Sequence, residues 1–145
     1  KDATFYGAEG RLTFQAFQSE RGELDISFQG DLVKANLDDR GDVPRIPPAR
    51  FGVGFSWHAP AWSADLNITK VMDQKDTGIG ELRTDGYTML DAYADYHFNL
   101  GSSELLIFAK GSNLLDEEVR NHTSFLKNFA PEPGRGFRVG VRYTY

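Results

Sequence analysis

The last stretch of the chain, residues 136–145, alternates apolar and polar positions without a break. Counting in twos from Phe137 to Tyr145 picks out only aromatic or β-branched side chains, whereas the positions between them are arginine, glycine and threonine. Such alternation places successive side chains on opposite faces of a β-strand. This segment is therefore predicted to be a strand with one wholly apolar face.

The same alternation recurs along the chain and predicts about seven strands. They cover residues 4–17, 23–36, 50–58, 62–71, 87–98, 103–113 and 136–145. In the first segment the apolar face is expected to run through Phe14 to Ala16. The pattern is weakest in 103–113, where Ile107 is assigned to the apolar face and Phe108 to the polar one.

The connections between these strands alternate in length. Short turns are predicted near 18–23, 59–60 and 99–102, and long polar loops near 37–49, 72–86 and 114–135. In an antiparallel meander, this order puts all short turns at one end and all long loops at the other. Outer-membrane barrels have this asymmetry. The predicted fold is all-β: an up-and-down antiparallel meander that forms a segment of a transmembrane β-barrel.

The distribution of aromatic residues supports a membrane setting. Mean hydropathy is −0.46, and no apolar run approaches the roughly 18 residues that a spanning helix needs, but barrel strands hide their apolar residues in alternate positions. Aromatic rings gather at a membrane–water interface. The aromatic residues predicted to lie at such an interface, near the short turns, are Trp57, Trp62, Tyr96, Tyr143 and Tyr145.

Composition narrows the function classes. The net charge of −5 argues against nucleic acid, and the absence of cysteine excludes disulfides and thiolate metal sites. No nucleophile motif and no phosphate-binding glycine loop is present, so neither an enzyme nor a cofactor is expected. A soluble lipocalin-like carrier of small ligands, or a small outer-membrane barrel acting as adhesin or hydrolase, are the alternatives.

The polar face carries charges of both signs, which are expected to line a wet lumen or to contact a protein within it. The residues assigned to this face are Glu9, Arg11, Asp65, Asp91, Asp95, Arg138 and Arg142. His58 and His97 lie on it too, with one strand between them and thus roughly 10 Å apart. His122, in the last long loop, is the one weak candidate for a metal ligand. Acidic loop residues such as Glu81 would either attract cations or keep the loops solvated.

Four stretches resemble TonB-dependent outer-membrane receptors. Residues 112–118 (SNLLDEE) resemble the segment at the end of the penultimate strand, 45–50 (RIPPAR) a loop, and 86–93 (GYTMLDAY) a strand of that family. Residues 124–135, with SFLK, AP and GR, are similar to a subset associated with zinc uptake. The resemblance covers residues 3–145 in the right order.

The resemblance implies that residues 1–145 are the C-terminal part of a plugged barrel of about 22 strands. Such a receptor takes up a scarce nutrient, here possibly zinc or a metal chelate, across the outer membrane of a Gram-negative bacterium. Its expected partners are outer-membrane lipid, its own N-terminal plug domain and TonB. Residues 1–5 show no signal peptide or start methionine, so an excised fragment is expected. Its open strand edges could pair with another copy.

Overall fold

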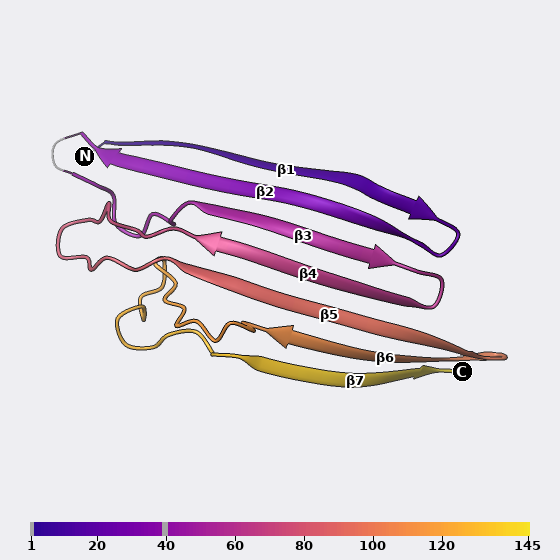
Figure 1. Ribbon diagram of the computed structural model, residues 1–145. Coiled ribbons are helices and arrows are strands. Elements are labelled where there is room, and N and C mark those ends of the chain that lie inside the picture. The colour runs from indigo at the N-terminus through magenta and orange to yellow at the C-terminus, as the bar shows by residue number, and fades with distance from the viewer. Residues whose placement is uncertain (1, 39–40) are drawn as a thin grey trace.

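The structure, a computed structural model that describes residues 2–38 and 41–145, is built on a single sheet (Figure 1). Its strands are β1 (Ala3–Ser19), β2 (Gly22–Leu37), β3 (Arg50–His58), β4 (Trp62–Val71), β5 (Tyr87–Leu100), β6 (Ser103–Ser112) and β7 (Gly136–Thr144). Each strand pairs antiparallel with the next in chain order. The predicted seven-stranded meander is confirmed. Residues 39 and 40, in the expected polar connection, lie outside the described residues.

The two ends of the sheet differ as predicted. Figure 1 shows the three short turns at one end, together with the C-terminus, and the three long connections at the other. The turn between β5 and β6 is tight because Gly101 adopts a φ of 75°, which a side chain would disfavour. Each strand therefore runs between the turn end and the loop end of the sheet.

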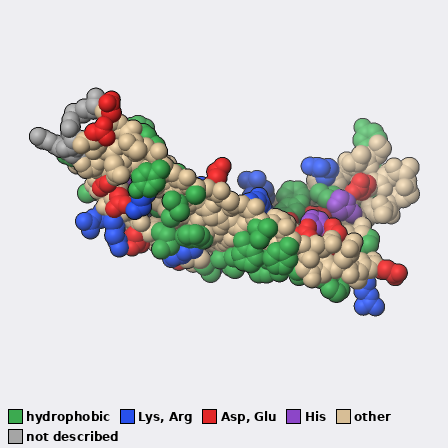
Figure 2. Space-filling model, turned by 90° about the horizontal axis from the view of Figure 1, so that it is seen from above, with side chains coloured by type: hydrophobic (Ala, Val, Ile, Leu, Met, Phe, Trp, Pro, Cys, Tyr) green, Lys and Arg blue, Asp and Glu red, His purple; other side chains and the backbone are tan. Residues whose placement is uncertain are grey.

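The register separates the side chains into two faces. One cross-strand row runs through Phe28, Val53, Ile68 and Leu90. A row of opposite parity runs through Asp25, Ser56, Asp65, Tyr93, Lys110 and Arg138. Figure 2 shows hydrophobic side chains gathered along the lower side of the molecule, with charged ones on the upper side of its middle. The predicted assignment of the two faces is thus reproduced.

A β-bulge in β1 corrects one detail of the prediction. The register shifts between Gln15 and Phe17, so Ala16 has no partner and Phe17 pairs with Leu24. One extra residue exchanges the two faces, because side chains alternate with a period of two. Phe17, rather than Ala16, therefore completes the apolar face, where its ring lies 6.2 Å from that of Trp57.

The weak alternation in β6 has a structural reason. Ile107 pairs with Val141 on the apolar face, and Phe108 pairs with Gly140 on the polar face, as predicted. A Cβ atom at Gly140 would lie only 2.3 Å from the Phe108 ring. The ring therefore occupies space that the glycine leaves open, and it also stacks 6.2 Å from Tyr93.

Burial is concentrated at the loop end rather than within the sheet. The buried apolar side chains are Ala35, Ile46, Val71 and Val119. The buried polar ones are Gln74, Thr84, Asn113, His122 and Lys127. All of them lie in the long loops or close to where these loops join strands. The small core therefore holds the loops together at one end of the sheet.

Candidate functional site

The central part of the polar face is a network of hydrogen bonds between neighbouring strands. The Ser56 hydroxyl donates to Asp65 at 2.6 Å, and the Ser63 hydroxyl donates to Asp95 at 2.5 Å. His97 Nε2 lies 3.2 Å from Asp95, and its Nδ1 contacts Glu104. Two of the predicted polar-face carboxylates, those of Asp65 and Asp95, are thus held by neighbouring strands.

His58 and His97 do not meet. His58 pairs in register with Ser63 of β4, and Ser63 pairs with Asp95 of β5, so one strand separates the histidines as predicted. His97 contacts the carboxylates of Asp95 and Glu104 instead. The register therefore keeps the two histidines of the polar face apart.

The two flanks of the polar face carry charges without a partner in the described chain. No ion pair or side-chain hydrogen bond joins Glu9, Arg11, Arg138 or Arg142 to another described residue. All four are exposed. Exposed charges of both signs on a concave sheet face offer contacts to a second protein surface, or to water, at little desolvation cost.

A hollow of about 540 Å³ opens on this face over β1, β2 and β3. Glu9, Arg11, Asp31 and Arg50 contribute its charged lining. The Arg50 guanidinium donates from Nε to both oxygens of Asp31 at 3.1 Å. Gly52 deepens the hollow, because a Cβ there would lie 2.8 Å from the Gln29 side chain. The hollow is polar and open, which suits a polar loop of a partner protein better than an apolar ligand.

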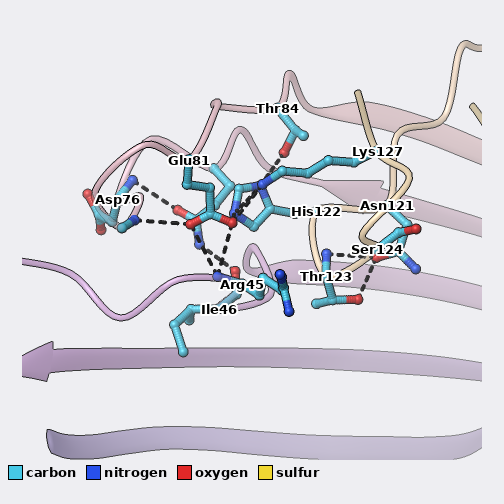
Figure 3. Close-up of polar contacts among 12 residues, drawn as sticks. Arg45, Ile46, Asp76, Glu81, Thr84, Asn121, His122, Thr123, Ser124 and Lys127 are labelled. Atoms are coloured by element: carbon cyan, nitrogen blue, oxygen red, sulfur yellow. Dashed lines mark hydrogen bonds and ion pairs between the residues drawn. The ribbon is translucent and has the colours of Figure 1, made fainter. Parts of the chain in front are cut away.

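The second feature is a polar cluster at the loop end, which we call the loop clamp (Arg45, Glu81, Thr84, His122 and Lys127; Figure 3). Its side chains are buried except for that of Arg45, which lies at the exposed rim. Lys127 Nζ donates to Glu81 Oε1 at 2.7 Å, and the backbone N–H of Arg45 donates to both Glu81 oxygens at 3.1 and 3.2 Å. Only 8% of the Glu81 side chain and 6% of the Lys127 side chain is exposed. A buried ion pair is stable only when further hydrogen bonds satisfy it, as they do here.

His122 completes the loop clamp in a neutral form. Its Nδ1 lies 2.9 Å from Thr84 Oγ1, and its Nε2 lies 3.2 Å from Glu81 Oε1. We assign the proton to Nε2, which then donates to the carboxylate while Nδ1 accepts from the Thr84 hydroxyl. Burial lowers the pKa of His122, the Lys127 ammonium lowers it further, and the Glu81 carboxylate opposes both.

Glu81 is held in its charged form. Burial raises the pKa of this carboxyl, but hydrogen bonds from Lys127 and from the N–H groups of Gly78 and Arg45 outweigh burial and lower it. The sequence had placed Glu81 among solvated or cation-attracting loop acids, and the structure corrects this. The Glu81 carboxylate is buried and forms an ion pair with Lys127.

The loop clamp is expected to weaken in acid in two stages. A lowered histidine pKa means that the opened loops bind the proton more tightly, so stability falls as the pH drops below about 6.5. Glu81, whose pKa is also lowered, adds a second loss below about 4.5. Amide exchange of the Arg45 N–H, corrected for intrinsic rates, measures both stages. His122→Gln should abolish the first stage only; an unchanged first stage would contradict the assignment.

The segment 112–118 closes the last loop rather than forming a binding site. Asn113, at φ 50°, donates from Nδ2 to the Glu117 carbonyl and accepts the Glu117 N–H at Oδ1, at 2.9 and 3.0 Å. The Asn113 N–H donates to Asp91 at 2.9 Å, which occupies this polar-face carboxylate. Asp116 accepts the Arg135 N–H at 2.9 Å, and this bond lowers the Asp116 pKa. The resembling motif therefore has a clear structural role.

The aromatic residues predicted to form an interface belt lie together at the turn end. Trp57 and Trp62 rings are 6.0 Å apart, and Tyr143 and Tyr145 rings are 6.3 Å apart. The Tyr96 ring lies 4.5 Å from that of Phe98, tilted by 43°, in the same end region. Their clustering follows the prediction, whereas their contact with a membrane interface stays a prediction.

The described residues contain no group of three or more histidine, aspartate or glutamate side chains that could hold a metal ion. His122 is fully buried, and both of its ring nitrogens face clamp atoms. The weak metal candidate is thus placed in a structural cluster. Within the described residues, no helix is long and apolar enough to cross a membrane.

Comparison with known families decides the class. The family described as "TonB dependent receptor-like, beta-barrel" matches residues 1–114, which is most of the chain. The chain belongs to this family. TonB-dependent receptor barrels are transport proteins of the Gram-negative outer membrane and not enzymes, which agrees with the expectation of no catalysis. The lipocalin-like carrier and the small adhesin or hydrolase barrel are set aside.

A solved structure shares the fold of nearly the whole chain. The copper transporter OprC matches with a TM-score of 0.75 and 22% identity, over 96% of this chain and 23% of OprC. The chain thus spans about a quarter of the length of that protein. At this identity the likeness concerns the fold, and it extends the match beyond residue 114 to the region of β7.

Proposed function

We propose that this chain is the C-terminal part of the barrel of a full-length receptor that takes up a scarce nutrient, with the plug domain in the preceding part of that protein. The apolar face would contact outer-membrane lipid, with Trp57, Trp62, Tyr96, Tyr143 and Tyr145 at one membrane interface. The observation that carries this proposal is the separation of a mainly apolar face from a mainly polar one across seven paired strands.

The polar face would turn to the lumen and contact the plug. The unpartnered charges of Glu9, Arg11, Arg138 and Arg142 support this orientation, because a second protein surface could pair them. The hollow between Glu9 and Arg50 would receive a plug loop. TonB, acting on the plug, would then drive uptake. The edges of β1 and β7 would pair with other strands of the closed barrel instead of with a second copy.

We propose a metal ion or a metal chelate as the class of nutrient. The similarity of residues 124–135 to a zinc-related subset supports metal, and the structurally similar OprC is a copper transporter. His122 and Glu81 would serve this function indirectly, by shaping the loops, and the tight site would use residues of the missing barrel or plug.

The proposal is tested in cells that carry or lack the full-length receptor. We expect growth under zinc starvation, or uptake of a labelled metal chelate, to require the receptor and to be abolished by deletion of its plug domain. Growth that depends on the receptor only with a non-metal nutrient would reject the metal class and keep the family. Nutrient uptake that survives plug deletion would contradict the proposed mechanism.

A further inference from the structure

Three loops that are far apart in the sequence meet at one carboxylate. Glu81 belongs to the β4–β5 loop, Arg45 to the β2–β3 loop, and Lys127 to the β6–β7 loop. The Arg45 N–H and Lys127 Nζ both donate to Glu81. Figure 3 shows these groups converging from separate segments of the chain.

Each pair of loops is also joined by at least one further contact. Gln74 Nε2 donates to the Ile46 carbonyl at 2.9 Å, which ties the β4–β5 loop to the β2–β3 loop. Thr84 contacts His122 and so ties the β4–β5 loop to the last one. The Arg45 guanidinium lies 3.3 Å over the Phe125 ring, which joins the first loop to the last. The contacts therefore form a closed triangle.

From this triangle we propose that the loop clamp makes segments 41–49, 72–86 and 113–135 open and close as one unit. Separating the β4–β5 loop from the β6–β7 loop would break the buried Glu81–Lys127 ion pair and leave a buried charge without its counter-charge. Separating the β2–β3 loop would take the Arg45 N–H away from the same buried carboxylate. Opening all three loops together should therefore cost less free energy than the three separate openings combined. The place of this unit in the receptor rests on the proposed function: the long loops of outer-membrane barrels lie on the extracellular side. The unit would then act as a single cover over the outer mouth of the lumen.

Amide hydrogen exchange of the full-length receptor tests the proposal without knowledge of the nutrient. In the unmodified receptor, peptides from the three segments should share one opening rate, distinct from that of the strands. Three different opening rates would overturn the proposal. Because this measurement does not involve transport, its outcome is independent of whether the cargo is a metal.

Glu81→Gln provides the second arm. This change removes the charge that Lys127 pairs with, so exchange should rise by about 100-fold in all three segments together. Peptides over β3 and β4 should keep their protection. Glu118→Gln is the matched control, because Glu118 lies in the last loop but forms an exposed pair with Arg120; it should change none of the three segments. A response confined to 72–86 would overturn the proposal.

Discussion

Arginine in place of Ile68 is expected to destabilise the membrane-inserted full-length receptor by about 2–4 kcal/mol. Ile68 lies within β4 on the apolar face, between Val53 and Leu90 in the cross-strand row. If this face contacts lipid, the guanidinium must either enter hydrocarbon or bend toward the interface. The free energy of unfolding in lipid vesicles, measured with denaturant, gives the cost.

Asn67→Arg is the matched control for this prediction. Asn67 is the preceding residue of the same strand, is exposed, and faces the polar side in register with Gly54 and Asp91. An arginine there would meet water and a carboxylate, so its cost should stay below about 0.5 kcal/mol. Equal costs at the two positions, or a larger one at Asn67, would contradict the assignment of the faces.

The strands and their faces could be predicted from the sequence because both depend on local pattern. In residues 62–71 and 136–145 the alternation has a single possible register, since a one-residue slip would exchange an apolar face for a polar one. The length of the connections then sufficed for the topology. Even the weak segment 103–113 was assigned correctly: Ile107 lies on the apolar face, in register with Tyr96 and Val141.

Two features depended on information that local pattern does not carry. The bulge at Ala16 leaves alternation intact on both sides and changes only its phase, so it becomes visible only through the pairing with β2. The loop clamp joins Glu81 to Lys127, which are 46 residues apart, in segments that read as ordinary polar loops. A charged loop residue is usually solvated, and only the fold shows which one is buried.

The structure also explains one of the segments that resemble the family. Residues 112–118 contain Asn113 and Asp116, both at positive φ, where asparagine and aspartate are tolerated better than other side chains. Their side chains hold the Glu117 and Arg135 backbones, so the motif serves to end β6 and return the chain to β7. Similarity in this segment therefore indicates shared architecture, and it carries no information on the nutrient.

Lys127→Met is expected to weaken the closed loop clamp by about 3 kcal/mol, the lower end of the range for a broken buried ion pair. The reason is the Glu81 carboxylate, which would stay buried with its backbone donors but without a counter-charge. Protection of the Arg45 amide should fall by about 100-fold, since 1.4 kcal/mol corresponds to a factor of ten. Amide exchange of the full-length receptor measures this loss.

The double variant Glu81→Gln and Lys127→Met separates the buried charge from the lost contact. Removing both charges leaves no unpaired ion, and the glutamine oxygen can still accept the Arg45 N–H. The double variant should therefore be more stable than Lys127→Met alone. The summed destabilisation of the two single variants should exceed that of the double variant by about 1–3 kcal/mol. Simple addition of the single costs would show that the two side chains act independently, and that the ion pair does not hold the loops.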